Sequence, residues 1–173
     1  MKYHNQSWHI PEETARIAKA AFPKRSPFMV MRDEIGILYE NSEFSDLFSH
    51  QGQPAESPGN LAMVMIMQYA EGLTDKQAVQ SVRGRIDWKY ALGLCLDDPG
   101  FDQSVLVRFR KRLMKEEQEM KLLEHMLALF MQRGWLKTSE QRTDSTHVVA
   151  AIRQLNRLEI VGETMRMALS ELA

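Results

Sequence analysis

A nearly continuous apolar segment at residues 61–69, Leu-Ala-Met-Val-Met-Ile-Met-Gln-Tyr, constrains the fold of this 173-residue chain more than any other feature. Ser57 followed by Pro58 predicts the N-cap and first turn of a helix, and Gly72 predicts its end. Apolar side chains surround this helix on nearly all sides, so it has to be buried on most of them. It is too short to span a bilayer. The segment therefore predicts a mainly α-helical globular fold with this helix at its centre.

Further helices are predicted on both sides of the central one. Residues 11–21 begin with a proline and two glutamates, which favour a helix start. Its apolar stripe consists of Ile17, Ala20 and Ala21. Thr74 and Gln77 have the spacing of a capping box and open another helix. The remaining predicted helices cover residues 29–39, 43–48, 86–92, 116–133 and 152–172.

A basic helix is predicted directly after a tight turn. Pro99 and Gly100 favour the turn, and Asp102 has the position of an N-cap. Residues 101–115 contain five Lys or Arg and one acid. One face of the helix is apolar, with Val105, Leu106, Phe109 and Leu113. The basic residues are Arg108, Arg110, Lys111, Arg112 and Lys115.

The basic side of this helix has two interpretations. A run of charges is usually a solvated face. This run has one sign, however, and is mostly arginine, whose planar guanidinium suits phosphate groups and base edges. The residues by themselves leave a helical bundle and a nucleic-acid-binding helix as alternatives.

A family resemblance bears on this choice. Several short pieces of residues 51–113 occur in a characteristic order: Gly52-Gln53-Pro54, the apolar helix 61–69, Glu71-Gly72-Leu73-Thr74-Asp75, Leu92-Gly93-Leu94, Asp97-Asp98-Pro99, Asp102-Gln103-Ser104 and Arg108-Phe109-Arg110-Lys111-Arg112-Leu113. Together they resemble the InsH-like N-terminal domain of insertion-sequence transposases of the DDE class. The resemblance implies a helix-turn-helix-like portion that binds the DNA of insertion-sequence ends through Ser104, Arg108, Arg110, Lys111 and Arg112.

The resemblance continues through Thr143-Asp144-Ser145-Thr146-His147 and Leu155-Asn156-Arg157-Leu158. Residues 141–149 are the one strand-like segment of the chain. Asp144 resembles the first carboxylate of the DDE triad, which holds two divalent ions, Mg²⁺ or Mn²⁺, in the full-length family. The other two carboxylates have no counterpart, so the chain is expected to be truncated, without cofactor and without catalytic activity. Taken alone, Asp144 is more typical of a turn or cap residue.

The predicted organisation has three parts: an N-terminal helical arm at 1–50, a helical DNA-binding domain at 51–134 and the start of an incomplete RNase H-like catalytic domain at 135–173. A second function stays open, because residues 155–172 form an amphipathic seam. On this alternative the chain is a helical interaction module that self-associates or pairs with full-length transposase. With no signal peptide and no membrane segment in view, a cytoplasmic location is expected. Cys95, the only cysteine, is expected to be a small buried residue.

Overall fold

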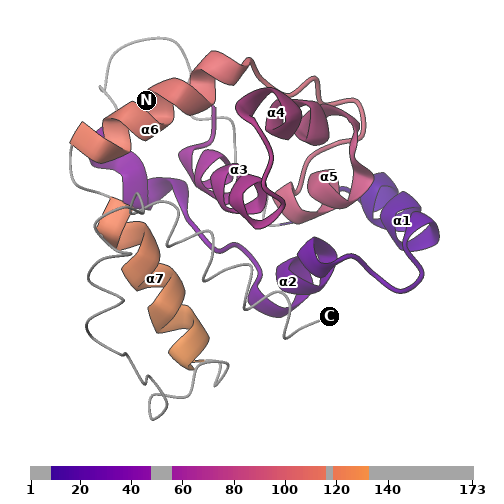
Figure 1. Ribbon diagram of the computed structural model, residues 1–173. Helices are drawn as coiled ribbons and strands as arrows, with labels where there is room; N and C mark the ends of the chain where they lie inside the picture. Colours follow the sequence, from indigo (N-terminus) through magenta and orange to yellow (C-terminus); the bar gives the residue numbers. More distant parts are fainter. Residues whose placement is uncertain (1–8, 48–55, 116–118, 133–173) are drawn as a thin grey trace.

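A computed structural model of the protein describes residues 9–47, 56–115 and 119–132. Within these ranges the chain is helical and forms no strand, which confirms the mainly α fold class (Figure 1). The predicted strand at 141–149 and helix at 152–172 lie outside the described residues. The elements are α1 (Glu12–Ala21), α2 (Pro27–Ile35), the 3-10 helix η1 (Asn41–Leu47), α3 (Pro58–Ala70), α4 (Asp75–Gly84), α5 (Ile86–Leu92), α6 (Gln103–Lys115) and α7 (Glu119–Gln132).

The central position predicted for the apolar helix is confirmed. Every residue of α3 from Leu61 to Gln68 is buried. Its neighbours are η1, α4, α5 and α6, which pack around it on different sides. In Figure 1, α3 lies in the middle of these elements. A helix without a polar face can be accommodated only in this way, because any exposed side would leave apolar surface in water.

One hydrophobic core joins residues from α2 to α7. Its aromatic rings meet edge to face. The ring centroids of Phe28 and Trp88 lie 5.9 Å apart, and those of Phe44 and Phe109 lie 5.7 Å apart. Phe28 and Phe44 precede residue 50, whereas Trp88 and Phe109 follow it. These contacts join residues on both sides of position 50, and the predicted division into three parts stays a prediction.

Local capping signals set the helix boundaries where they were predicted. The Ser57 hydroxyl accepts a hydrogen bond from the backbone N–H of Asn60 at 3.2 Å, with proline at the start of α3. Thr74 and Gln77 form the capping box of α4, in which each side chain satisfies the other residue's backbone N–H. Gly93 ends α5 in the left-handed conformation, at φ 66°.

The apolar stripe predicted for α1 is wrong. Ala20 and Ala21 are exposed, and the buried residues are Thr14 and Ala18. The hydroxyl of Thr14 donates a hydrogen bond to the carbonyl oxygen of Leu94 at 2.9 Å. This bond lets a polar side chain face α5, against which α1 packs. The buried face of α1 is therefore the one that carries Thr14 and Ala18, and not the one that carries Ala20 and Ala21.

Two smaller predictions also differ from the structure. The helix predicted to reach residue 39 ends at Ile35, because Gly36 adopts a positive φ of 82°. Cys95 is exposed rather than buried. It lies in the loop after α5, where its carbonyl oxygen accepts a hydrogen bond from the Lys89 ammonium at 3.3 Å.

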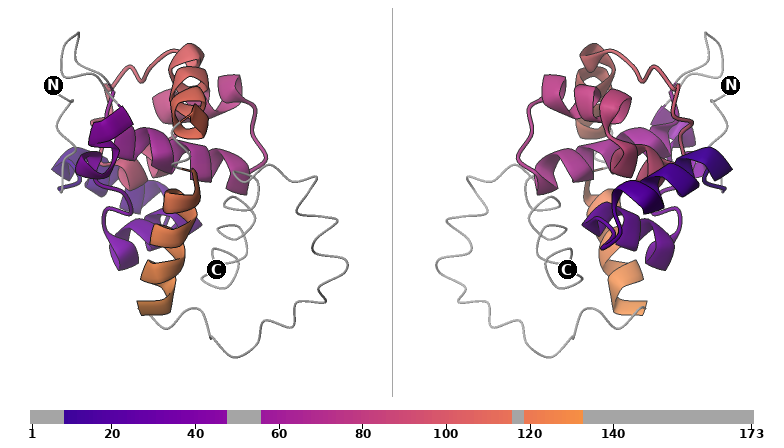
Figure 2. Two further views of the ribbon diagram at one scale, coloured as in Figure 1. Left: turned by 90° about the vertical axis from the view of Figure 1, so that its left-hand side faces the viewer. Right: turned by 90° about the vertical axis from the view of Figure 1, so that its right-hand side faces the viewer.

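The helix α7 projects away from the end of α6 (Figure 2). Its described contacts reach the chain before α3. His125 Nδ1 lies 2.7 Å from a carboxylate oxygen of Glu43, and its ring is 5.5 Å from that of Tyr39. Met126 is fully buried in the core. No helix among the described residues is long and apolar enough to cross a membrane.

Candidate nucleic-acid interface

A loop held in place by α4 and α5 leads into α6. The buried side chain of Lys89 donates a hydrogen bond to the carbonyl oxygen of Asp98 at 2.8 Å. Gly100 has a positive φ of 63°, and its backbone N–H donates to the Asp98 carboxylate at 2.8 Å. The Asp102 carboxylate accepts a hydrogen bond from the backbone N–H of Ser104 at 2.9 Å, so its predicted capping role is confirmed. The loop thus fixes where α6 begins.

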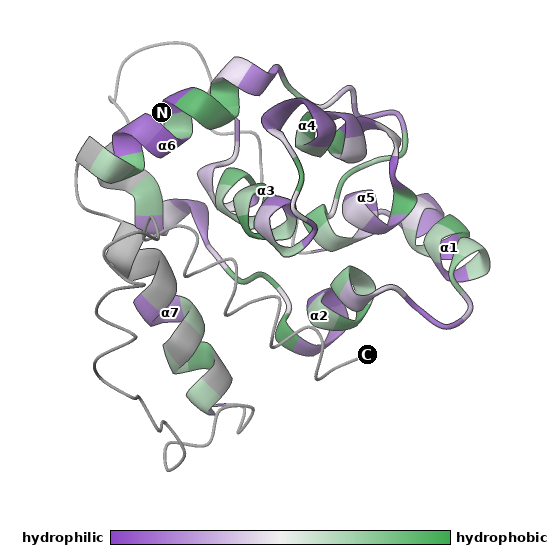
Figure 3. Ribbon diagram, in the orientation of Figure 1, coloured by the Kyte–Doolittle hydropathy of each residue, from purple (hydrophilic) through white to green (hydrophobic). Residues whose placement is uncertain are grey.

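The apolar back of α6 anchors the helix in the core. Leu106, Phe109 and Leu113 are buried, and the partly buried Val105 packs against them. This is the face that the sequence predicts. Figure 3 shows α6 alternating between hydrophobic and hydrophilic residues, as a helix with one buried face does. Because the back is fixed, the direction of the opposite face is fixed too.

The outer face of α6 brings together four of the five predicted DNA-binding residues. Ser104, Arg108, Lys111 and Arg112 are all exposed. Ser104, Arg108 and Lys111 follow a spacing of four and three residues, so they form one ridge. The Arg108 side chain turns back along this ridge, and its Nε donates to the carbonyl oxygen of Ser104 at 3.3 Å. We call Ser104, Arg108, Lys111 and Arg112 the α6 face.

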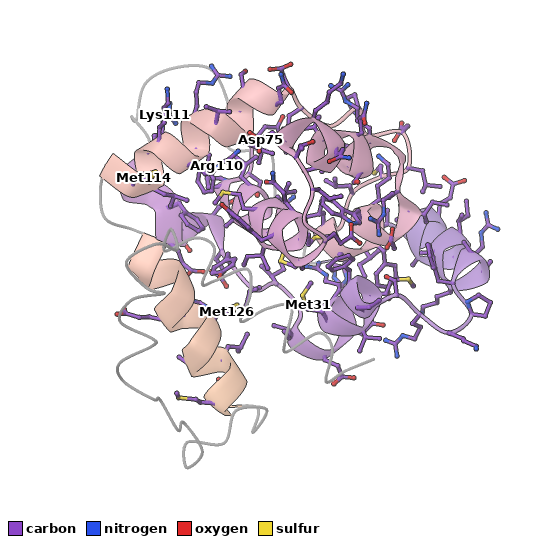
Figure 4. The ribbon with its side chains drawn as sticks, in the orientation of Figure 1. Met31, Asp75, Arg110, Lys111, Met114 and Met126 are labelled. Atoms are coloured by element: carbon purple, nitrogen blue, oxygen red, sulfur yellow. The ribbon has the colours of Figure 1, made fainter. Side chains whose placement is uncertain are left out.

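Arg110 is the exception, because its guanidinium points to α4. It forms an ion pair with Asp75, the first residue of that helix, whereas Lys111 lies on the outer side of α6 (Figure 4). Gln68 of α3 also donates to the Asp75 carboxylate, at 2.8 Å. Burial alone would raise the pKa of Asp75, but the hydrogen bonds from Gln68 and Arg110 and the Arg110 charge hold it below its usual value. Arg110 therefore joins three helices rather than extending the α6 face.

The helix α5 offers no comparable surface. Its residues from Asp87 to Leu92 are all buried, including the charged side chains of Asp87 and Lys89. Asp87 is paired with Arg85 at 2.7 Å, and Arg85 also pairs with Glu71. A helix enclosed in this way has no free face for a groove of DNA. Between the two helices on either side of the turn, α6 is the one that presents side chains outward.

A second polar ridge, on α4, was not predicted from the sequence. Lys76, Gln80 and Arg83 are exposed at a spacing of four and three residues. The opposite side of α4 is buried through Ala78 and Val82. The same periodicity is readable in the sequence, but only two of the three residues are basic, so the charge count did not single out this helix. We call Lys76, Gln80 and Arg83 the α4 ridge.

The predicted catalytic and metal-binding residue Asp144 lies outside the described residues. Among the residues that the structure does describe, no group of three or more His, Cys, Asp or Glu side chains is placed to hold a metal ion. The described part of the chain thus contributes a basic surface and its supporting core. The role of Asp144 stays a prediction.

The fold and this surface define a class of protein: a helical domain that presents a basic helix on one side of a single core. A family model described as "Transposase domain (DUF772)" matches residues 17–112. The match covers more than half of the chain, so this protein belongs to that transposase family, and its role relates to transposition. No curated protein and no solved structure matches the chain.

Proposed function

We propose that this chain is a DNA-binding part of an insertion-sequence transposase and that the α6 face contacts the DNA. The observation that carries the proposal is that Arg108, Lys111 and Arg112 lie on the exposed face of α6, while the opposite face of this helix packs into the core. Family membership supplies a reason for contact with DNA, since transposition acts on DNA ends. The resemblance to InsH-like N-terminal domains points to the same helix.

The chemistry of the α6 face suits a duplex. Lys111 is a compact cation that can neutralise a phosphate, whereas the guanidinium groups of Arg108 and Arg112 can bond to phosphate oxygens or to a guanine edge. An α-helix fits the major groove of B-DNA. Ser104, one turn before Arg108, adds a hydroxyl that can donate to a phosphate or a base. The proposal predicts binding that weakens steeply as the salt concentration rises.

Membership of the DDE class belongs to the same proposal. On this interpretation Asp144 is the first carboxylate of the triad and binds Mg²⁺ or Mn²⁺ only together with the other two. A single carboxylate cannot hold the pair of ions, about 3.5–4 Å apart, that phosphoryl transfer of this type uses. We therefore expect the 173-residue chain by itself to cleave no DNA strand. Incubation with supercoiled DNA and Mn²⁺ checks this, and nicking that disappears in Asp144→Ala would contradict it.

The DNA-binding proposal is tested by fluorescence anisotropy with a labelled duplex over a series of NaCl concentrations. The combined variant Arg108→Gln, Lys111→Gln and Arg112→Gln should weaken binding and reduce the slope of log K against log salt by about 2.7, or about 0.9 for each lost phosphate contact. Arg110→Gln is the matched control on the same helix, because its guanidinium is engaged with Asp75. An unchanged affinity in the folded triple variant would refute the proposal.

A second candidate is a helical module that binds another protein chain. The amphipathic seam at 155–172, which suggested this function in the sequence, lies outside the described residues. A different observation favours it: Met114 and Met131 are large apolar side chains that remain 55% and 51% exposed. Sedimentation velocity over a range of concentrations distinguishes the two functions. A stable oligomer without affinity for DNA would support the interaction module.

A further inference from the structure

The α4 ridge consists of side chains with no evident role in the core. Lys76 and Gln80 are exposed on the outer side of α4, and Arg83 continues their line toward the end of the helix. The single acidic residue of α4, Asp75, does not face outward with them, because it is bonded to Gln68 and Arg110. The ridge therefore consists of two cations and one amide, with no carboxylate.

Two links set α4 beside α6 in antiparallel orientation. At the start of α4, Asp75 pairs with Arg110 from the middle of α6. At its other end, Arg83 Nε donates to the carbonyl oxygen of Pro99 at 2.9 Å, and its terminal nitrogen donates to that of Phe101 at 3.1 Å. Both acceptors lie just before α6. The helices α4 and α6 are consequently neighbours, and Figure 1 shows α4 close to the start of α6.

The acid at the junction of the two helices is flanked by cations. Asp102 is fully exposed at the start of α6, and its pKa is held below the usual value by hydrogen bonds from Ser104 and by the charges of Arg83 and Arg108. These two arginines belong to different helices. Basic side chains of α4 and α6 therefore meet around one ionised carboxylate, that of Asp102.

We propose that the α4 ridge is a second line of contact with the same DNA duplex, in which Lys76 and Gln80 bond to backbone phosphates beside the groove occupied by α6. The proposal rests on the DNA-binding function proposed above. The dimensions support it. The major groove is about 12 Å wide and α6 with its side chains fills it, whereas packed helices lie about 8–10 Å apart. A helix beside α6 therefore meets the phosphates that border the groove.

Lys76 and Gln80 are suitable for testing the proposal, because neither takes part in the links that hold α4 in place. Arg83 is less suitable, since its loss would release Pro99 and Phe101. With the full chain and a labelled duplex of mixed sequence, Lys76→Gln should reduce the slope of log K against log salt by about 0.9. Gln80→Glu, which adds a negative charge to the ridge, should weaken binding severalfold.

The matched control is Lys19→Gln on α1, an exposed lysine on a helix that packs against α5, away from α6. It should leave affinity and slope unchanged, and far-UV circular dichroism should show all variants folded. If Lys76→Gln and Gln80→Glu bind as the parent does while the α6 triple variant loses affinity, the second line of contact is refuted and the proposed function stands. Equal losses in Lys19→Gln and Lys76→Gln would also refute it, because they would indicate a general charge effect. A parent chain without salt-dependent binding would remove both proposals.

Discussion

Replacing Phe109 with alanine tests whether the core and the α6 face are opposite sides of one helix. Phe109 is 2% exposed, and its ring meets that of Phe44 edge to face with a centroid distance of 5.7 Å. Removing a buried aromatic ring costs about 3–5 kcal/mol, because apolar contacts are lost and a cavity remains. The aromatic pair accounts for about 0.5–1.5 kcal/mol of this. We expect the free energy of unfolding to fall by about 3–5 kcal/mol.

Urea denaturation followed by far-UV circular dichroism measures this loss. It is a large fraction of the about 5–15 kcal/mol by which domains are usually stable, so Phe109→Leu provides a milder variant that keeps the chain folded. Met114→Ala is the control on the same helix. Its side chain is 55% exposed, so stability should change by no more than about 0.5 kcal/mol. A Phe109→Ala chain within about 1 kcal/mol of the parent would show that the described packing of α6 is wrong.

The other predictions concern the elements that hold α4 and α6 together. A double-mutant cycle of Arg110→Gln and Asp75→Asn should give a coupling of about 0.5–1 kcal/mol, since the pair is partly exposed, and zero coupling would contradict the ion pair. The pKa of Asp75 is lowered in the folded chain, so ionised Asp75 stabilises the fold fully above about pH 4. This stabilisation is lost as the pH falls through the lowered pKa. Asp75→Asn should therefore remove this acid dependence from the urea midpoints measured at each pH. Thr74→Ala should cost about 1 kcal/mol in thermal unfolding through the loss of the capping box, and an unchanged melting temperature would refute that role. Gly100→Ala should cost about 1–2 kcal/mol of stability, because φ is +63° and the new Cβ would lie 3.0 Å from a side-chain carbon of Arg83. In the control Gly84→Ala the new Cβ meets nothing within 4 Å, so this variant should not be destabilised.

Features that depend on a few neighbouring residues could be predicted from the sequence. The caps at Ser57 and Thr74 and the end of α5 at Gly93 involve partners within one or two turns. The burial of α3 follows from its own composition, whatever surrounds it. The buried face of α6 was also predicted, because Leu106 and Phe109 have a spacing that allows only one apolar side.

Features that depend on distant partners could not be predicted in this way. Thr14 is buried because a carbonyl 80 residues away, that of Leu94, accepts its hydrogen bond. Arg110 leaves the α6 face because Asp75, 35 residues earlier, attracts it. Neither partner is implied by helical periodicity. The α4 ridge was missed for a related reason, since its importance comes from its position beside α6 rather than from its own charge.

The pairing of Arg110 changes how the basic cluster has to be counted. If all four residues Arg108, Arg110, Lys111 and Arg112 contacted phosphates, α6 would contribute about 3.6 to the salt slope. With Arg110 directed to Asp75, the three exposed residues Arg108, Lys111 and Arg112 would contribute about 2.7 if each contacted a phosphate. The difference equals one phosphate contact, about 0.9, which the anisotropy series can resolve. Because Asp75 is only partly exposed and is hydrogen-bonded to Gln68, releasing Arg110 to the DNA would leave a carboxylate without its cation. The contacts between α3, α4 and α6 thus determine how many charges α6 can offer to a nucleic acid, and the charge count of the helix alone does not.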